Sequence, residues 1–161
     1  MPMARAKPKP LTPEEAAKLD EFREQERNAP LDWFKHDNDA HMDEGMRLLI
    51  AERGMASYGL YWCLMELLAA RKCHFYDVST ELGWQLLARD MSPGVEVMSV
   101  YECQGFIEAL ADLGKIDYEC YHESGHIISN RICRNAAECS ESTAQNRFKG
   151  WRSGRSRRGE V

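Results

Sequence analysis

The stretch "SYGLYWCLMELLAARK" at residues 57–72 constrains the fold more than any other part of the chain. Its large apolar side chains recur at spacings of three and four residues, which is the period of an amphipathic helix. These residues are Tyr58, Tyr61, Trp62, Met65 and Leu68. Three leucines widen the stripe until little polar surface is left, and such a helix is stable in water only when other elements surround it. We therefore predict that it forms the centre of the core.

The same run is too short to cross a membrane. Its uncharged part stops near Glu66, and no uncharged segment of the chain reaches the roughly 18 residues that a membrane span needs. The N-terminal segment "MPMARAKPKP" has basic residues but no apolar segment behind them, so it does not resemble a secretory signal. We expect a soluble cytoplasmic protein whose six cysteines, none in a CxxC pair, are reduced.

A helical arm is predicted before the body. The first ten residues, rich in Pro and Lys, are expected to be disordered. Thr12 then provides an N-cap, Pro13 the first helical position and Glu15 the second half of a capping box. Because only Leu19 and Phe22 give this helix an apolar face, we expect an arm that orders against a partner.

Three more helices are predicted in the body, at about 38–53, 79–91 and 95–114, with a short extended piece at 73–78. The first is expected to be capped by one of the polar residues 37–39, and Gly114 closes the third. The side chains expected in the core are Met42, Met46, Leu49 and Ile50 in the first helix, and Val97, Val100, Tyr101, Ile107, Leu110 and Leu113 in the third.

The period changes after Gly114. In "KIDYECYHESGHIISNRI", side chains alternate from Ile116 to Cys120, break at "ESG" and alternate again to Ile132, which predicts a β-hairpin. Helices followed by a hairpin are the order of a winged helix-turn-helix. We predict a mainly α fold with a small β-hairpin (α+β) and with N- and C-terminal helical arms. Its expected divisions are a disordered tail and helical arm at 1–30, a winged-helix domain at 31–135, and a C-terminal helix with a basic tail at 136–161.

Charge is distributed unevenly along the chain. Residues 31–146 hold nine basic and nineteen acidic side chains, whereas residues 147–161 hold six basic and one acidic. In the tail "RFKGWRSGRSRR" the cations alternate with Phe148 and Trp151, a pattern that suits phosphate neutralisation and base stacking. The predicted DNA-binding residues are Arg131 and Arg134 near the wing, and Arg147, Lys149, Trp151, Arg152, Arg155, Arg157 and Arg158 in the tail.

The predicted recognition helix argues against sequence reading. Between Arg89 and Lys115 there is no lysine or arginine, but five acidic residues are present. A helix in the major groove normally brings Arg, Lys, Asn or Gln to base edges. We therefore expect DNA binding of low sequence specificity through the tail.

Two clusters could hold a metal ion. His36, Asp37, His41 and Asp43 surround an HD dipeptide, but helix-start chemistry explains their acidic residues without a cofactor. The second cluster is Cys120, His122, His126 and Cys133, whose spacing differs from that of a standard zinc finger. We favour surface histidines beside a wing turn, with zinc as the alternative. No Walker A, GxGxxG or GxSxG pattern is present, so we predict no cofactor and no enzymatic activity.

Three segments together resemble a known family. "WFKHDNDAHMDEGMRLL", "YGLYWCLMELLA" and "LADLGKIDYE" are similar to the N-terminal domain of phage replisome-organiser proteins, a DnaD-like winged-helix group. The resemblance runs from residue 32 to about 135. It implies a winged helix in phage DNA replication within a bacterial host cell, acting by origin binding or by handing on a helicase loader.

Two functions follow as hypotheses. One is a phage or prophage replication accessory held on DNA by its basic tail. The other is a protein-interaction module whose acidic winged helix binds a host replication, transcription or defence protein. The sequence leaves homodimerisation open.

Overall fold

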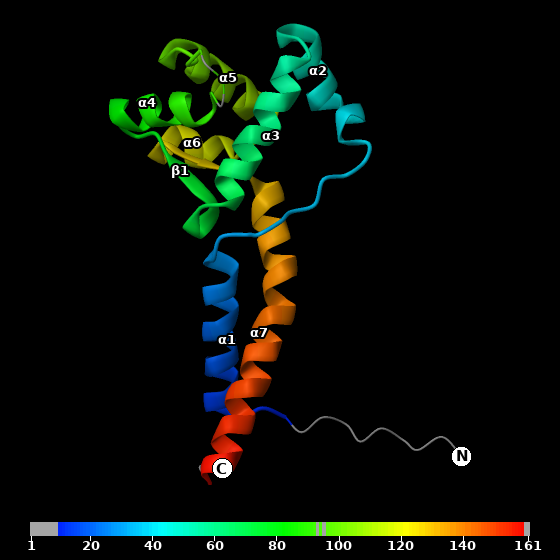
Figure 1. The fold of residues 1–161 in the computed structure, drawn as a ribbon, viewed down its shortest axis with the longest axis vertical. Helices are drawn as coiled ribbons and strands as arrows, with labels where there is room; N and C mark the ends of the chain where they lie inside the picture. The colour runs from blue at the N-terminus through cyan, green and yellow to red at the C-terminus, as the bar shows by residue number, and fades with distance from the viewer. Residues whose placement is uncertain (1–9, 93, 95, 160–161) are drawn as a thin grey trace, which may run out of the picture.

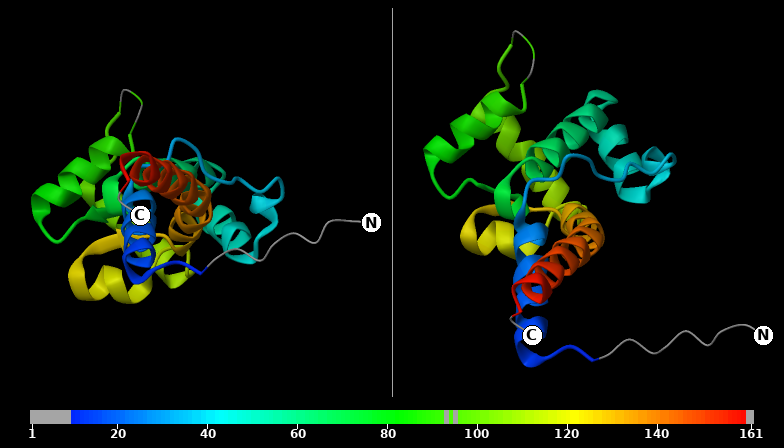
Figure 2. Two further views of the ribbon diagram at one scale, coloured as in Figure 1. Left: turned by 90° about the horizontal axis from the view of Figure 1, so that it is seen from below. Right: turned by 60° about the horizontal axis from the view of Figure 1, so that its bottom comes forward.

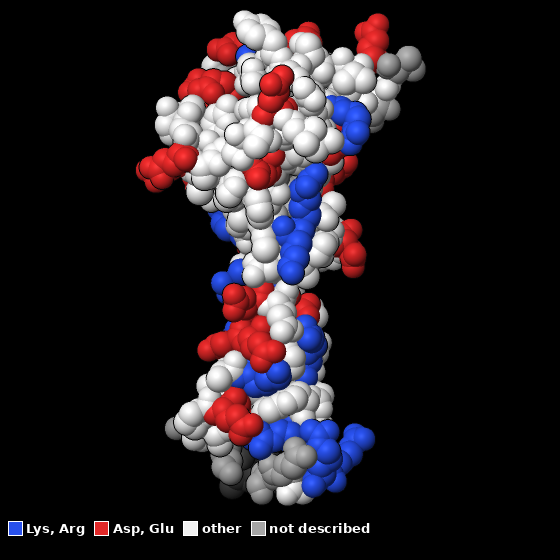
Figure 3. Space-filling model, turned by 90° about the vertical axis from the view of Figure 1, so that its left-hand side faces the viewer, with Lys and Arg blue, Asp and Glu red and all other residues white. Residues whose placement is uncertain are grey.

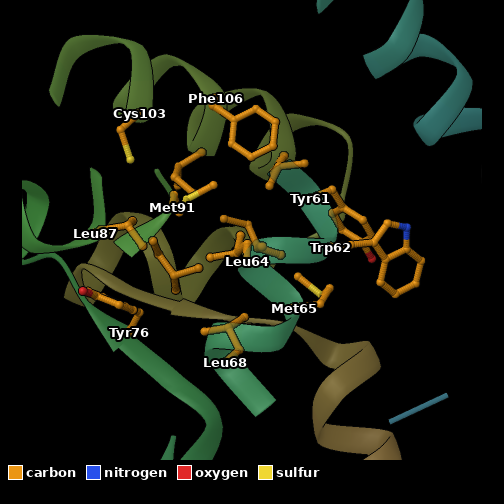
Figure 4. Packing of buried hydrophobic residues seen from close by; sticks show 14 of the residues in the cluster. Tyr61, Trp62, Leu64, Met65, Leu68, Tyr76, Leu87, Met91, Cys103 and Phe106 are labelled. Carbon is orange, nitrogen blue, oxygen red and sulfur yellow. The ribbon is translucent and has the colours of Figure 1, made fainter. Parts of the chain in front are cut away.

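Helix α3 (Ala56–Ala69) runs through the centre of the body in the computed structural model, which describes residues 10–92, 94 and 96–159. Its side chains Leu64, Met65 and Leu68 are completely buried, and Figure 4 shows them among side chains from α4, α5 and β1. The central position predicted from the apolar sequence is confirmed.

The body surrounds α3 with short elements (Figure 1). The helices are α2 (Glu44–Arg53), α4 (Glu81–Asp90), α5 (Val100–Asp112) and α6 (Tyr118–Ser124), with 3-10 turns η1 (Ala40–Met42) and η2 (Lys72–His74). The strands are β1 (Phe75–Asp77) and β2 (His126–Ile128). The mainly helical α+β class is therefore confirmed at this coarse level.

The predicted hairpin at 115–132 is wrong. Strand β2 pairs antiparallel with β1, so that Tyr76 lies opposite Ile127, and the extended piece predicted at 73–78 supplies the partner strand. The first half of the expected hairpin is helix α6. It forms because the Asp117 side chain accepts a hydrogen bond from the Cys120 backbone N–H (2.9 Å), and Gly125 ends it in the left-handed conformation (φ +71°).

Two helices begin later than predicted. The Asp43 side chain, rather than residues 37–39, caps α2 by accepting from the Met46 N–H (3.0 Å), which leaves Met42 outside the helix and 58% exposed. A capping box formed by Ser99 and Glu102 starts α5. Val97 is therefore left before the helix and is 62% exposed. Tyr101, in the first turn of α5, is 85% exposed, so this second side chain expected in the core is also on the surface.

The two arms form a stalk, which we define as α1 (Pro13–Asn28) together with α7 (Asn130–Arg158). The helices run antiparallel and side by side, away from the body (Figures 1 and 2). Their small separate core consists of Leu19, Phe22, Ala144, Phe148 and Trp151. The predicted Thr12 capping box is present, and the partner of the N-terminal arm is α7.

Helix α7 is one continuous element that passes through the boundary expected between residues 135 and 136 and includes most of the basic tail. Disorder was expected over the first ten residues, and residues 1–9 of these lie outside the described residues. All six cysteines are free thiols in the structure. No helix in the described part of the chain combines the length and hydrophobicity that crossing a bilayer requires.

Acid should loosen the stalk. Arg23 of α1 donates two hydrogen bonds of 2.9 Å to Glu141 of α7, which lower the pKa of Glu141 to about 2 from its ordinary 4.5. A carboxylate with a lowered pKa stabilises the folded state above its ordinary pKa and loses this contribution as the pH falls toward 2. We expect the amide signals of residues 13–28 to shift toward coil values across this window in an NMR titration. The Glu141→Gln variant should show a smaller shift over this window because it lacks this carboxylate, and an equal shift in the variant would contradict the assignment.

Candidate nucleic-acid interface

Positive charge gathers at the end of the stalk that lies away from the body (Figure 3). We call this region the stalk end, meaning residues 147–158 of α7 and residues 10–18, where α1 begins. Cations close to a helix C-terminus also offset the negative end of the helix dipole. The cations that α7 contributes are Arg147, Lys149, Arg152, Arg155, Arg157 and Arg158.

Three of these cations are bound by glutamates of α1. Arg152 pairs with Glu15 (2.8 Å between Nε and Oε1), and Arg155 pairs with Glu14 (2.6 Å between Nη1 and Oε1). Arg147 pairs with Glu26 and also donates to the side-chain oxygen of Gln25 (3.0 Å). The sequence predicted these arginines as DNA contacts, but it gave no indication that acidic side chains lie across from them.

The aromatic residues of the tail are also engaged. Phe148 is buried, and its ring stacks on that of Trp151 with 5.7 Å between centroids. The Arg155 guanidinium lies 5.1 Å from the centre of the Trp151 ring, and that of Arg147 lies 4.5 Å from the centre of the Phe22 ring. In this conformation Phe148 is not accessible to a base, and Trp151 is half-buried.

Two stalk-end cations make no ion pair with another described residue. They are Lys149 and Arg157, and both are exposed. Arg158 is also exposed, in the last turn of α7. Lys149 and Arg157 therefore give the stalk end its accessible positive charge.

Arg131 and Arg134 lie at the other end of α7, against the body. Arg131 donates to Asp37 (2.8 Å) and to the Lys35 carbonyl oxygen (3.2 Å), so it fastens this segment to α7. Arg134 is exposed and donates within its own helix to the Asn130 carbonyl (3.3 Å). The predicted DNA-binding residues therefore separate into two groups, and only the stalk-end group forms a cluster.

The HD dipeptide, His36 and Asp37, is held by contacts with α3 and α7. The His36 ring stacks on Trp62 with 3.8 Å between centroids, and its Nε2 lies 3.1 Å from the Tyr58 hydroxyl. Asp37 binds Arg131, whose guanidinium lies 5.1 Å from the centre of the Trp62 ring. These contacts hold the segment before α2 against α3 and α7.

A cavity of about 360 Å³ lies beside this segment. It contains cations from Lys115 and Arg131, each already paired with an aspartate, and a third carboxylate, Asp39, without an ion pair to a described residue. The hydrogen bond from Lys115 lowers the pKa of Asp43, so that carboxylate stays charged. The mixed charges provide no consistent preference for an anion.

No group of three or more His, Cys, Asp or Glu side chains among the described residues is placed to hold a metal ion. The four residues of the zinc alternative are divided between α6, β2 and α7. The His122 ring instead lies 3.4 Å from the Glu108 carboxylate, and the His126 ring lies 4.8 Å from that of Phe75.

Helix α5 presents an acidic surface with exposed apolar side chains. Tyr101, Glu102 and Asp112 of α5 are exposed, and so are Glu96 and Val97 in the segment just before the helix. The apolar spacing predicts both Val97 and Tyr101 in the core. The capping box of Ser99 and Glu102, which starts α5 at Val100, was the signal that could have placed Val97 outside the helix.

Comparison with known proteins gives one family. The family model described as Lin1244/Lin1753-like, N-terminal, matches residues 33–132, which is well over half of the chain. The match covers the body and the first turn of α7, but it excludes α1 and the stalk end. No curated protein and no solved structure matches the chain.

Proposed function

The chain belongs to the Lin1244/Lin1753-like N-terminal family, and on that premise we propose that it is a non-enzymatic, DNA-binding accessory protein of phage or prophage DNA replication. Its resemblance to replisome organisers supports the role in replication. The observation that carries the DNA contact is the segregation of charge, with accessible cations at the stalk end and an acidic body.

The order of elements supports a winged-helix body. The body has the order helix (α3), strand (β1), two helices (α4 and α5) and a second strand (β2) that pairs with the first. Helix α6 stands where the inner strand of a wing would be. The second helix of the pair, α5, is acidic on its exposed segment and would repel phosphate. The DNA contact is therefore assigned to the stalk end, which attracts any sequence by counterion release.

Reversing the charges of Lys149 and Arg157 tests this assignment. Lys149→Glu combined with Arg157→Glu should weaken the binding of labelled DNA by at least about tenfold and reduce the slope of log K against log salt by about 2. Fluorescence anisotropy at several salt concentrations measures both quantities. Substitution is preferable to deletion of residues 147–161, because deletion also removes Phe148 and Trp151 from the stalk core.

The matched control reverses two exposed cations on the body. Arg47 and Lys72 are exposed and make no ion pair with a described residue, so Arg47→Glu combined with Lys72→Glu gives the same change in net charge. This control should bind DNA nearly as the wild type does. An equal loss in both variants would mean that net charge alone governs binding and would refute the stalk-end assignment.

The second candidate is a protein-interaction module that binds a basic surface of a host replication protein, such as a helicase loader, or of a transcription or defence protein. Exposed Tyr101 in the first turn of α5 and Val97 just before the helix favour it, because each is next in sequence to an exposed glutamate. Lack of DNA binding by the wild-type protein at low salt would favour this candidate over the first.

A further inference from the structure

We infer that the face of α7 now covered by α1 is the main binding surface for single-stranded DNA, and that α1 is an acidic cover which leaves that face when the strand binds. This inference rests on the proposed function and adds to it both the strandedness of the ligand and a regulatory element. It follows from three features of the stalk.

The first feature is the match of charges across the two helices. α1 carries six acidic and three basic side chains, whereas residues 147–158 of α7 carry six basic side chains and no acidic one. Glu14, Glu15 and Glu26 occupy positions against Arg155, Arg152 and Arg147. Because a phosphate oxygen bonds a guanidinium as a carboxylate oxygen does, a DNA backbone could replace these glutamates one for one.

The second feature is the pair of aromatic residues beneath the cover. Phe148 and Trp151 stack on each other and pack against Leu19 and Phe22 of α1. Once α1 departs, their outer faces and the arginines beside them form the combination of stacking platform and cations that binds unpaired bases. Bases within a duplex are already stacked on each other, so this surface favours a single strand.

The third feature is the weak attachment of α1. Only Leu19 and Phe22 are buried among its residues, and its tie to the body is a hydrogen bond between the Arg27 carbonyl oxygen and the His74 ring (2.9 Å), outside the apolar core of the body. The four ion pairs that join α1 to α7 are partly exposed to solvent, where such pairs contribute little stability. A helix of this length is marginal when isolated, and the body core contains no residue of α1, so exchanging α1 for a strand leaves that core complete.

The test removes the charges of the cover and keeps its helix. The full-length variant Glu14→Gln, Glu15→Gln, Glu26→Gln loses the three carboxylates that face α7, and Gln at position 15 still completes the capping box. We expect this variant to bind a fluorescein-labelled oligo(dT) 20-mer about tenfold more tightly than the wild type does at equal salt.

A second triple variant distinguishes the effect of losing the α1–α7 ion pairs from the effect of net charge. Asp20→Asn, Glu21→Gln, Glu24→Gln changes the charge of α1 by the same amount at positions that form no ion pair with α7 in the described structure. It should bind the oligonucleotide no more than about twofold more tightly than the wild type. Equal gains in the two triple variants would overturn the inference.

Hydrogen exchange on the wild-type protein gives an independent readout. Saturating oligo(dT) should increase amide exchange across residues 13–28 and leave the exchange of α3 unchanged. Binding with α1 still protected would overturn the inference and leave the proposed function standing. If neither the wild type nor either triple variant binds DNA at low salt, the proposed function and the inference fail together.

Discussion

The substitution Leu64→Ala is expected to lower the free energy of unfolding by about 2–5 kcal/mol, the range typical of removing a buried leucine side chain. Leu64 is completely buried in α3, at the point where α4 and α5 pack around that helix. Protein interiors are packed as densely as organic crystals, so the neighbours cannot fill the space left by the missing side chain. Urea denaturation followed by circular dichroism measures the loss.

The surface control for this prediction is Leu48→Ala. Leu48 lies on α2 and is 47% exposed, so its removal should change the unfolding free energy by no more than about 0.5 kcal/mol. A loss below 1 kcal/mol for Leu64→Ala, about the same as for the control, would show that α3 is not the centre of the core.

Helix α3 could be predicted because its information is local. Every turn of the segment repeats the apolar pattern, and the helix needs no distant partner to be recognised. The α1 start was predictable for the same reason, since Thr12 and Glu15 form a capping box within four residues. Both elements have the positions that the sequence indicated.

The sheet could not be predicted in this way. β1 and β2 are separated along the chain by α4, α5 and α6, so no turn motif connects them. The alternation between Ile116 and Cys120 looked like a strand, but a short helix with an aspartate cap satisfies the same few residues. In so short a segment the cap at Asp117 determined the outcome, and periodicity did not.

The residues of the candidate interface could be predicted, but not that most of them are paired with α1. The cations of the tail are evident from the sequence, yet their partners in α1 lie more than 100 residues away. The same glutamates that start α1 favourably also face α7, and a cap signal does not reveal this second role. Complementary charge in the two arms, acidic in one and basic in the other, was the available hint.

Gly83→Ala should destabilise the protein by about 1–3 kcal/mol, although replacing glycine by alanine inside a helix ordinarily stabilises it. Gly83 lies in the first turn of α4, where a Cβ atom would stand 2.5 Å from the Asp77 carbonyl oxygen and 3.0 Å from the Val78 Cα. Both obstacles are backbone atoms. The Val78 N–H donates to the Gly125 carbonyl (2.8 Å), so this backbone cannot retreat without breaking a link between the ends of β1 and α6.

Gly59→Ala is the matched test, because it makes the same change within α3 at a position where a Cβ atom would meet nothing within 4 Å. Helix propensity then acts alone and should stabilise the protein by up to about 1 kcal/mol. The two variants should therefore shift the urea midpoint in opposite directions. If Gly83→Ala also stabilised the protein, α4 could not pack as closely on the end of β1 as the structure places it, and the arrangement of the helix pair α4 and α5 on the sheet would have to be revised.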